Sequence, residues 1–328
     1  MRLALALIAA WLALAPAAAS AGTGGARAAA RIAAEIIAPG YRALDAEARA
    51  HAGAWAAYCA APDAAGFTGL RSSFHRLADA WAAIEFVRSG PMAQDYRSER
   101  LYLWPERKNA VEKALNALLS ARNPADLEPR AMKTASAAVQ GIPALERLLF
   151  GPAGVADGGF RCQAGAAIAR NAAAIAAEIT AATAVPATSE AAKAALATDI
   201  VTAYSVIKDR KIEPVLGADR GSARSRLAEA WRSGRSLRAM EINLEVLAAV
   251  AAIALEAGPE DASLPYTAST ALRIAQSLSG DLGAIAAGAA RGDLVLLRDA
   301  VNAAEDRAIA EIPAALGVTI GFNSLDGD

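Results

Sequence analysis

The sequence predicts an all-α protein built from two helical bundles. Of its 328 residues, 55% are hydrophobic and only 5% are aromatic, and alanine dominates the apolar set. This composition favours helices over strands. Apolar residues recur at helical spacing and do not alternate as in strands; one example is the series Phe74, Leu77, Trp81 and Ile84. Long helices joined by short breaks are typical of bundles.

In the first half of the chain, proline and glycine mark where the predicted helices end. Pro62 closes one helix, Ser89-Gly90-Pro91 closes the next, and Asn123-Pro124 interrupts the chain again. Pro143 suits the first turn of a further helix, and a glycine-rich loop follows at 151–159. The helices expected before Pro143 cover 26–38, 41–61, 63–88, 106–122 and 126–139.

The second half of the chain continues with long helices rich in alanine. Pro186, with its Thr and Ala neighbours, marks the predicted boundary between an N-terminal bundle (22–186) and a C-terminal bundle (187–328). A break is expected from Glu213-Pro214 to Gly221. The helices expected on either side of these breaks cover 161–184, 188–212, 222–256, 268–290 and 293–311.

The first 21 residues are typical of a signal peptide. A positive start at Arg2 precedes an apolar run from Leu3 to Ala15 and then a stretch of small residues. The run is too short to cross a bilayer comfortably, and the small residues suit cleavage after Ala19 or Ala21. The alternative is an uncleaved anchor helix. We expect an exported protein that has no stable membrane insertion.

Export favours a disulfide between Cys59 and Cys162, the only two cysteines. Such a bridge would stabilise the fold by about 4.7 kcal/mol in the chain-entropy model. The alternative is a pair of separate buried thiols. Neither of the two histidines, His51 and His75, stands at ligand spacing from a cysteine, so a zinc site is not expected.

Charge and motifs exclude several functions. Lys and Arg total 33 against 34 for Asp and Glu, and no basic cluster stands out, which argues against nucleic-acid binding. The chain lacks a G-x-S-x-G elbow, a phosphate loop and an H-E-x-x-H helix. His75 has Asp79 four residues on, and the pair is either a ligand-orienting contact or a surface pair on one helix.

Four fragments in order resemble the imelysin family of bacterial cell-envelope proteins. They are Phe74-x-x-Leu-x-x-Ala-Trp81, Leu101-Tyr-Leu-Trp104-Pro105-Glu106, Gly141-Ile-Pro-Ala-Leu-Glu146 and Glu229-Ala-Trp231-Arg232-Ser233-Gly-Arg-Ser236. The similarity spans roughly residues 28 to 320. It implies two helical bundles with the functional site where they meet, a periplasmic location and a link to iron uptake.

The family signature, G-x-H-x-x-E, is incomplete in this chain. Gly141 and Glu146 match it, but Pro143 stands at the histidine position. Proline has no ligating or proton-transferring group, so the segment cannot form a metal-binding or acid–base pair. The resemblance therefore favours a non-catalytic protein that binds a small ligand or an envelope iron-transport protein. The alternative is a metallopeptidase of the imelysin peptidase family.

The resemblance and the charges together suggest a polar pocket between the bundles. A buried Glu146 would need a partner, which Arg232 or Arg71 could supply. Trp104 and Trp231 would form its walls, and Ser236 would complete the lining. The alternative is that the tryptophans are core anchors and that Glu146 is a carboxylate in the first turn of its helix. No metal ligands and no cofactor are expected, although the family's link to iron leaves iron open.

Overall fold

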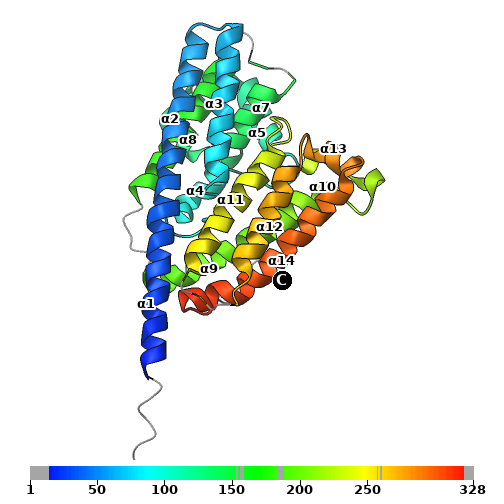
Figure 1. The fold of residues 1–328 in the computed structure, drawn as a ribbon. Helices are drawn as coiled ribbons and strands as arrows, with labels where there is room; N and C mark the ends of the chain where they lie inside the picture. Colours follow the sequence, from blue (N-terminus) through cyan, green and yellow to red (C-terminus); the bar gives the residue numbers. More distant parts are fainter. Residues whose placement is uncertain are drawn as a thin grey trace, which may run out of the picture.

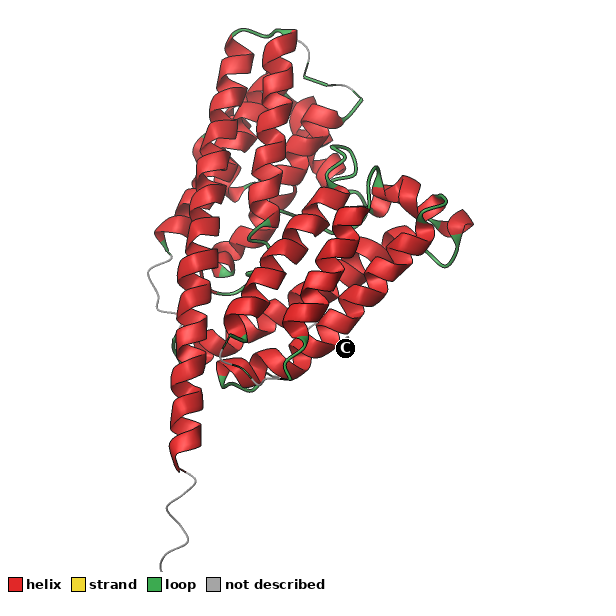
Figure 2. Cartoon of the chain, in the orientation of Figure 1, coloured by secondary structure: helices red, strands yellow, loops and turns green. Residues whose placement is uncertain are grey.

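A computed structural model of the chain describes residues 15–152, 154–155, 159–182, 188–256, 258 and 261–320. The predicted all-α fold is confirmed, since the described residues form helices and loops without a strand (Figure 2). No helix among them is long and apolar enough to cross a membrane. Most of the predicted signal peptide, the boundary at Pro186 and the last eight residues lie outside the described part.

The N-terminal bundle is built around α2, α3 and α8, which lie side by side in the upper part of Figure 1. Its core contains buried large side chains such as Tyr41, Trp55, Phe74 and Leu77. Its elements are α2 (Ala38–Ala60), α3 (Ala64–Ala82), η2 (Gly90–Met92), η3 (Gln94–Tyr96), α4 (Arg97–Leu101), α5 (Ala110–Ala121), η4 (Pro124–Leu127), α6 (Pro129–Thr134), η5 (Ala137–Val139), α7 (Ile142–Phe150) and α8 (Phe160–Ala181).

The C-terminal bundle is built around α9, α11, α12 and α14, which run diagonally across the lower right of Figure 1. Buried Leu247, Leu264, Leu297 and Val301 belong to its core. Its elements are α9 (Glu190–Ser205), η6 (Val206–Ile212), α10 (Glu213–Leu216), η7 (Arg220–Ser222), η8 (Ser225–Leu227), α11 (Ser236–Ala254), α12 (Leu264–Ser277), α13 (Leu282–Ala287) and α14 (Arg291–Leu316).

The first helix belongs to both bundles. α1 (Ala15–Ile32) continues through the π-helical turn η1 (Ala33–Ile37) into α2, so the break expected at Pro39-Gly40 does not occur. A π-helical turn directly before Pro39 accommodates a residue that has no N–H to donate. α1 packs on α9, α11 and α14 of the C-terminal bundle, whereas α2 packs on α3 and α8.

The largest departure from the predicted elements is at 222–256, where the helix begins only at Ser236. Asp219 and Ser222 close a capping box around a short 3-10 turn. Ala230 (φ 46°) and Gly234 (φ 68°) then adopt left-handed backbone conformations that an α-helix cannot include. These residues turn the chain into a loop that reaches back to the N-terminal bundle.

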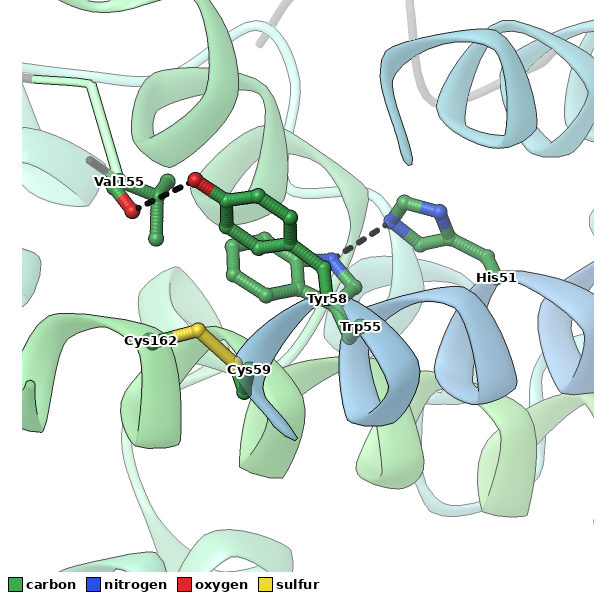
Figure 3. The surroundings of a disulfide bond; sticks show 6 residues. All are labelled: His51, Trp55, Tyr58, Cys59, Val155 and Cys162. Carbon is green, nitrogen blue, oxygen red and sulfur yellow. Dashed lines mark hydrogen bonds between the residues drawn. A yellow bond between two sulfur atoms is a disulfide. The ribbon is translucent and has the colours of Figure 1, made fainter. Parts of the chain in front are cut away.

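The disulfide between Cys59 and Cys162 is confirmed. It joins the end of α2 to the start of α8, with Cα atoms 5.8 Å apart (Figure 3). Beside it, Trp55 donates a hydrogen bond to His51 and Tyr58 donates one to the carbonyl of Val155. The bridge and these bonds hold the two longest helices of the N-terminal bundle in register.

Candidate functional site at the junction of the bundles

Glu146 lies buried in α7 and binds the loop that precedes α11. Its carboxylate accepts hydrogen bonds from the Ser233 backbone N–H (2.9 Å) and the Ser233 hydroxyl (2.8 Å). Burial raises the pKa of Glu146, and the Ser233 hydrogen bonds and the charge of Arg232 oppose that shift. This contact joins the N-terminal bundle to the C-terminal bundle.

The start of α7 depends on Gly141. A Cβ atom there would stand 2.0 Å from the carbonyl oxygen of Leu101, so only glycine allows this approach. Pro143 occupies the first turn of α7, where its missing N–H needs no partner. The residue that replaces the signature histidine is therefore a good helix starter.

Neither predicted arginine pairs directly with Glu146. Arg232 has its guanidinium 4.3 Å from the Trp231 ring centroid and 3.8 Å from the Glu112 carboxylate. Arg71 lies over the rings of Phe150 (4.4 Å) and Phe67 (5.2 Å). The expected guanidinium partner was wrong, because the turn before α11 presents the backbone and hydroxyl of Ser233 to the carboxylate instead.

A buried lysine lies at the centre of the junction. Lys211, in the π-helical turn η6, is 1% exposed and contacts the carboxylates of Glu229 (2.7 Å) and Glu85. It also donates to the Asn243 side chain (2.7 Å), which in turn donates to the Ala82 carbonyl (2.6 Å). Burial and the neighbouring charge of Glu229 raise the pKa of Glu85 to about 7.

Aromatic side chains surround this lysine. Trp104 has its ring centroid 6.0 Å from the Lys211 ammonium, and the Trp104–Pro105 peptide bond is cis. Tyr102 stacks on Trp81 with ring centroids 5.2 Å apart. Burial and the charges of the nearby carboxylates, chiefly that of Glu229, raise the pKa of Tyr102 well above its usual range. Trp104 thus lies near the buried lysine, and Tyr102 lies near its two carboxylates.

Another ion pair crosses the junction near the surface. Arg235, directly before α11, pairs with Asp79 on α3. The spacing of four residues had suggested a contact between Asp79 and His75. Asp79 instead bonds Arg235. His75 stacks on Phe150 with ring centroids 5.3 Å apart, and burial lowers its pKa.

The remaining predicted residues lie nearby without meeting Glu146. The Ser236 hydroxyl donates to the Glu229 carbonyl (2.5 Å), so it holds the start of α11 rather than lining a pocket. Two cavities in the described structure are lined by residues other than those predicted for the pocket. One of about 300 Å³ lies beside Tyr58 and Phe67, and one of about 1030 Å³ lies between α1 and α14.

The junction residues do not fit a metal ion. The only carboxylate of the degenerate signature, Glu146, is already bonded by two donors from Ser233, and proline replaces the second ligand. Among the described residues, no group of three or more His, Cys, Asp or Glu side chains could hold a metal ion. We therefore derive no chemical step that passes through a metal at this site.

The fold and the junction define a class of two-bundle helical proteins joined by buried ion pairs. The sequence model of the imelysin family, a peptidase family by name, matches residues 37–316, and the chain belongs to this family. The structure resembles an imelysin-like protein from Psychrobacter arcticum 273-4, with a TM-score of 0.77 and 18% identity over 92% of this chain and 98% of that one.

A second solved structure shares the fold. It is a putative iron-regulated protein A precursor from Parabacteroides distasonis, with a TM-score of 0.64 and 13% identity over 90% of this chain and 94% of that one. A search of curated proteins found no match. At these identities the likeness shows the fold alone.

Sequence reasoning missed the residues at the centre of the junction, namely Lys211, Glu85, Tyr102 and Asn243. Tyr102 and Glu229 stand in fragments that carry the family resemblance, which was the available signal. The sequence gives no signal that Lys211 is buried. It follows three charged residues, Lys208, Asp209 and Arg210, and such a run is typical of a solvated helix face.

Proposed function

We propose that this imelysin-family protein is a non-catalytic periplasmic binding protein that serves iron uptake. It would bind a small ligand or an envelope transport protein, not nucleic acid. The observation that carries the proposal is that Glu146 is bonded to Ser233 while Pro143 replaces the signature histidine. A peptidase metal centre needs several protein ligands and an open coordination position, whereas the 141–146 segment supplies one carboxylate that is already bonded to Ser233.

Two observations support the proposed place of action, and a third supports the link to iron. The first 21 residues have the pattern of a cleavable signal peptide. The Cys59–Cys162 disulfide suits an oxidising compartment. The fold is shared with a protein named as iron-regulated. No resident cofactor is part of this proposal.

Peptide hydrolysis is the first test. Purified protein incubated with casein and zinc or ferrous iron should give no turnover that a chelator abolishes. Glu146→Ala should lower the free energy of unfolding by about 1–3 kcal/mol, because Ser233 loses its acceptor. Arg232→Ala is the matched control and should lower it by less than about 1 kcal/mol, since its partner Glu112 is exposed.

Growth under iron limitation tests the physiological role. Deleting the gene should slow growth in iron-depleted medium, and a Glu146→Gln copy should restore it, because the amide oxygen still accepts from Ser233. Chelator-sensitive hydrolysis that is lost in a folded Glu146→Ala variant would overturn the non-catalytic proposal. Normal growth of the deletion strain would overturn the link to iron.

A further inference from the structure

The connection between α10 and α11 is rich in arginine. Residues 217–235 contain five arginines and two acidic residues, in a chain whose net charge is −1. No basic cluster stands out in the sequence because other residues separate these arginines. Figure 1 shows the connection, in yellow-green, projecting beside α10 and α13.

The fold removes one of the two acidic residues of this connection from its surface charge, because the Glu229 carboxylate is buried against Lys211. The Asp219 carboxylate stays exposed and caps the Ser222 N–H (2.8 Å). Arg232 and Arg235 face Glu112 and Asp79 of the N-terminal bundle. What is left is a surface with an excess of positive charge, in which three arginines stand against the Asp219 carboxylate.

Three exposed arginines make up this surface: Arg220, Arg224 and Arg226. Within the described part of the chain, no carboxylate lies within ion-pair distance of any of them, and the only ring contact is that of Arg226 with Trp231, at 5.8 Å. Leu227, the next residue, is 44% exposed. We call residues 220–227 the arginine loop.

The arginine loop has a fixed backbone. The Asp219–Ser222 capping box closes its first turn. The Arg224 N–H donates to the Val215 carbonyl (2.9 Å), and Arg291 donates to the carbonyls of Leu216 (2.5 Å) and Gly217 (2.8 Å). A surface held in this way loses little backbone entropy when a partner binds.

We propose that the arginine loop docks a carboxylate-rich segment of a protein partner. A guanidinium presents a planar fork of donors that matches a carboxylate in two parallel hydrogen bonds. Exposed Leu227 and half-buried Trp231 border the charges, and arginine with tryptophan is the composition of energetically important interface residues. The inference rests on the proposed function in one respect, namely that a partner exists.

A protein segment fits this surface better than an anionic membrane does. Each basic side chain near an anionic lipid surface strengthens binding only roughly fivefold, so three arginines on one short loop give a weak anchor. Membrane-binding helices also need a broad apolar face, whereas the arginine loop offers the single exposed side chain of Leu227.

Binding of a defined peptide tests the proposal on the full-length protein. The probe is a fluorescein-labelled peptide of alternating glutamate and glycine, and the matched peptide has glutamine for glutamate. The protein should bind only the acidic peptide, and more weakly as salt is raised from about 50 to about 300 mM. The triple variant Arg220→Gln, Arg224→Gln and Arg226→Gln should raise the Kd about tenfold or more.

A control variant separates the arginine loop from net charge. Arg42→Gln, Arg130→Gln and Arg170→Gln remove three exposed arginines of the N-terminal bundle and should change the Kd by about twofold or less. Equal weakening by both triple variants would overturn the proposal, as would equal binding of the two peptides. Loop-dependent binding to phosphatidylglycerol vesicles without binding to the acidic peptide would assign the surface to membranes instead.

The two proposals fail in different ways. Chelator-sensitive peptide cleavage would overturn the non-catalytic function and leave the acidic-peptide result intact. Absence of acidic-peptide binding would overturn the docking surface and leave the evidence against catalysis untouched.

Discussion

Buried ionisable side chains lie at the contact between the two bundles. The partners of each side chain decide how much it contributes to the stability of the fold. Replacing a whole buried ion pair by apolar residues is often neutral, whereas removing one partner leaves an unpaired charge and destabilises by about 3–5 kcal/mol. Lys211 with Glu85 and Glu229 is such a group. Removing any one of the three would therefore leave an unpaired charge at the contact between the bundles.

His51 is a buried histidine whose two ring nitrogens are both bonded. Ser73 donates its hydroxyl proton to the Leu70 carbonyl, so Nδ1 of His51 donates to the Ser73 oxygen at 2.7 Å. Trp55 donates to Nε2 at 2.9 Å. The arrangement fits only the neutral ring, and burial lowers the pKa of His51 to about 3.

This histidine predicts a loss of stability in acid. A histidine whose pKa is lower in the folded state adds stability above its unfolded pKa, near 6.5, and loses it as the pH falls. Between about pH 7 and about pH 5 its contribution to the free energy of unfolding should fall by about 2 kcal/mol.

Urea unfolding of the protein and of His51→Gln at both pH values measures this contribution. The pH slope should be smaller in the variant, whatever its absolute stability. Equal slopes in the two proteins would show that His51 is not held neutral by the fold.

At single residues, sequence reasoning was accurate about burial and inaccurate about partners. It named Glu146 as a residue that must find a partner if buried, and Glu146 is buried. It could not name Ser233, because a backbone N–H is present at every non-proline residue and carries no signal in the sequence. The burial of Lys211 could not be predicted either, because it depends on two glutamates more than 15 residues away in the sequence.

Small residues determine how closely the helices of the N-terminal bundle approach. α8 buries a run of alanines together with Gly165, and α2 packs against this face. A Cβ atom on Gly165 would stand 2.2 Å from the Trp55 ring, which is fully buried and bonded to His51. The ring therefore occupies the space that a side chain would need.

Gly165→Ala should destabilise the protein although alanine favours helices. The gain in helix propensity is about 1 kcal/mol, and overpacking typically costs about 1–3 kcal/mol, so we expect a net loss of up to about 2 kcal/mol. Gly53→Ala in α2 is the matched control, since nothing lies within 4 Å of its Cβ position, and it should stabilise. Thermal unfolding of the two variants compares them, and a stabilising Gly165→Ala would contradict the packing described.

The predicted helices were most accurate where apolar spacing and proline agreed. α7 begins next to Pro143 and α8 covers Phe160–Ala181, close to the expected ranges. The prediction failed at 222–235, because alanine, leucine and arginine favour helix there while Ala230 adopts a left-handed backbone (φ 46°). The turn places Ser233 against Glu146 of the other bundle, a contact that local sequence does not contain.

One disulfide contributes to the stability of the whole N-terminal bundle. The disulfide closes a segment of 103 residues that contains α3 to α7. Replacing both cysteines by alanine should lower the free energy of unfolding by about 2–5 kcal/mol. Urea unfolding with and without reductant measures this: the wild type should weaken on reduction, and the double variant should not respond. A reduced wild type as stable as the oxidised one would contradict the prediction.

The packing of α1 sets an order of events during synthesis. α1 is the first described helix to be made, and one of its main partners is α14 (Arg291–Leu316), the last. Contacts between such distant segments form late, because a long chain must first close on itself. The C-terminal bundle therefore reaches its final packing only after α14 has emerged, and α1 remains without that partner until then.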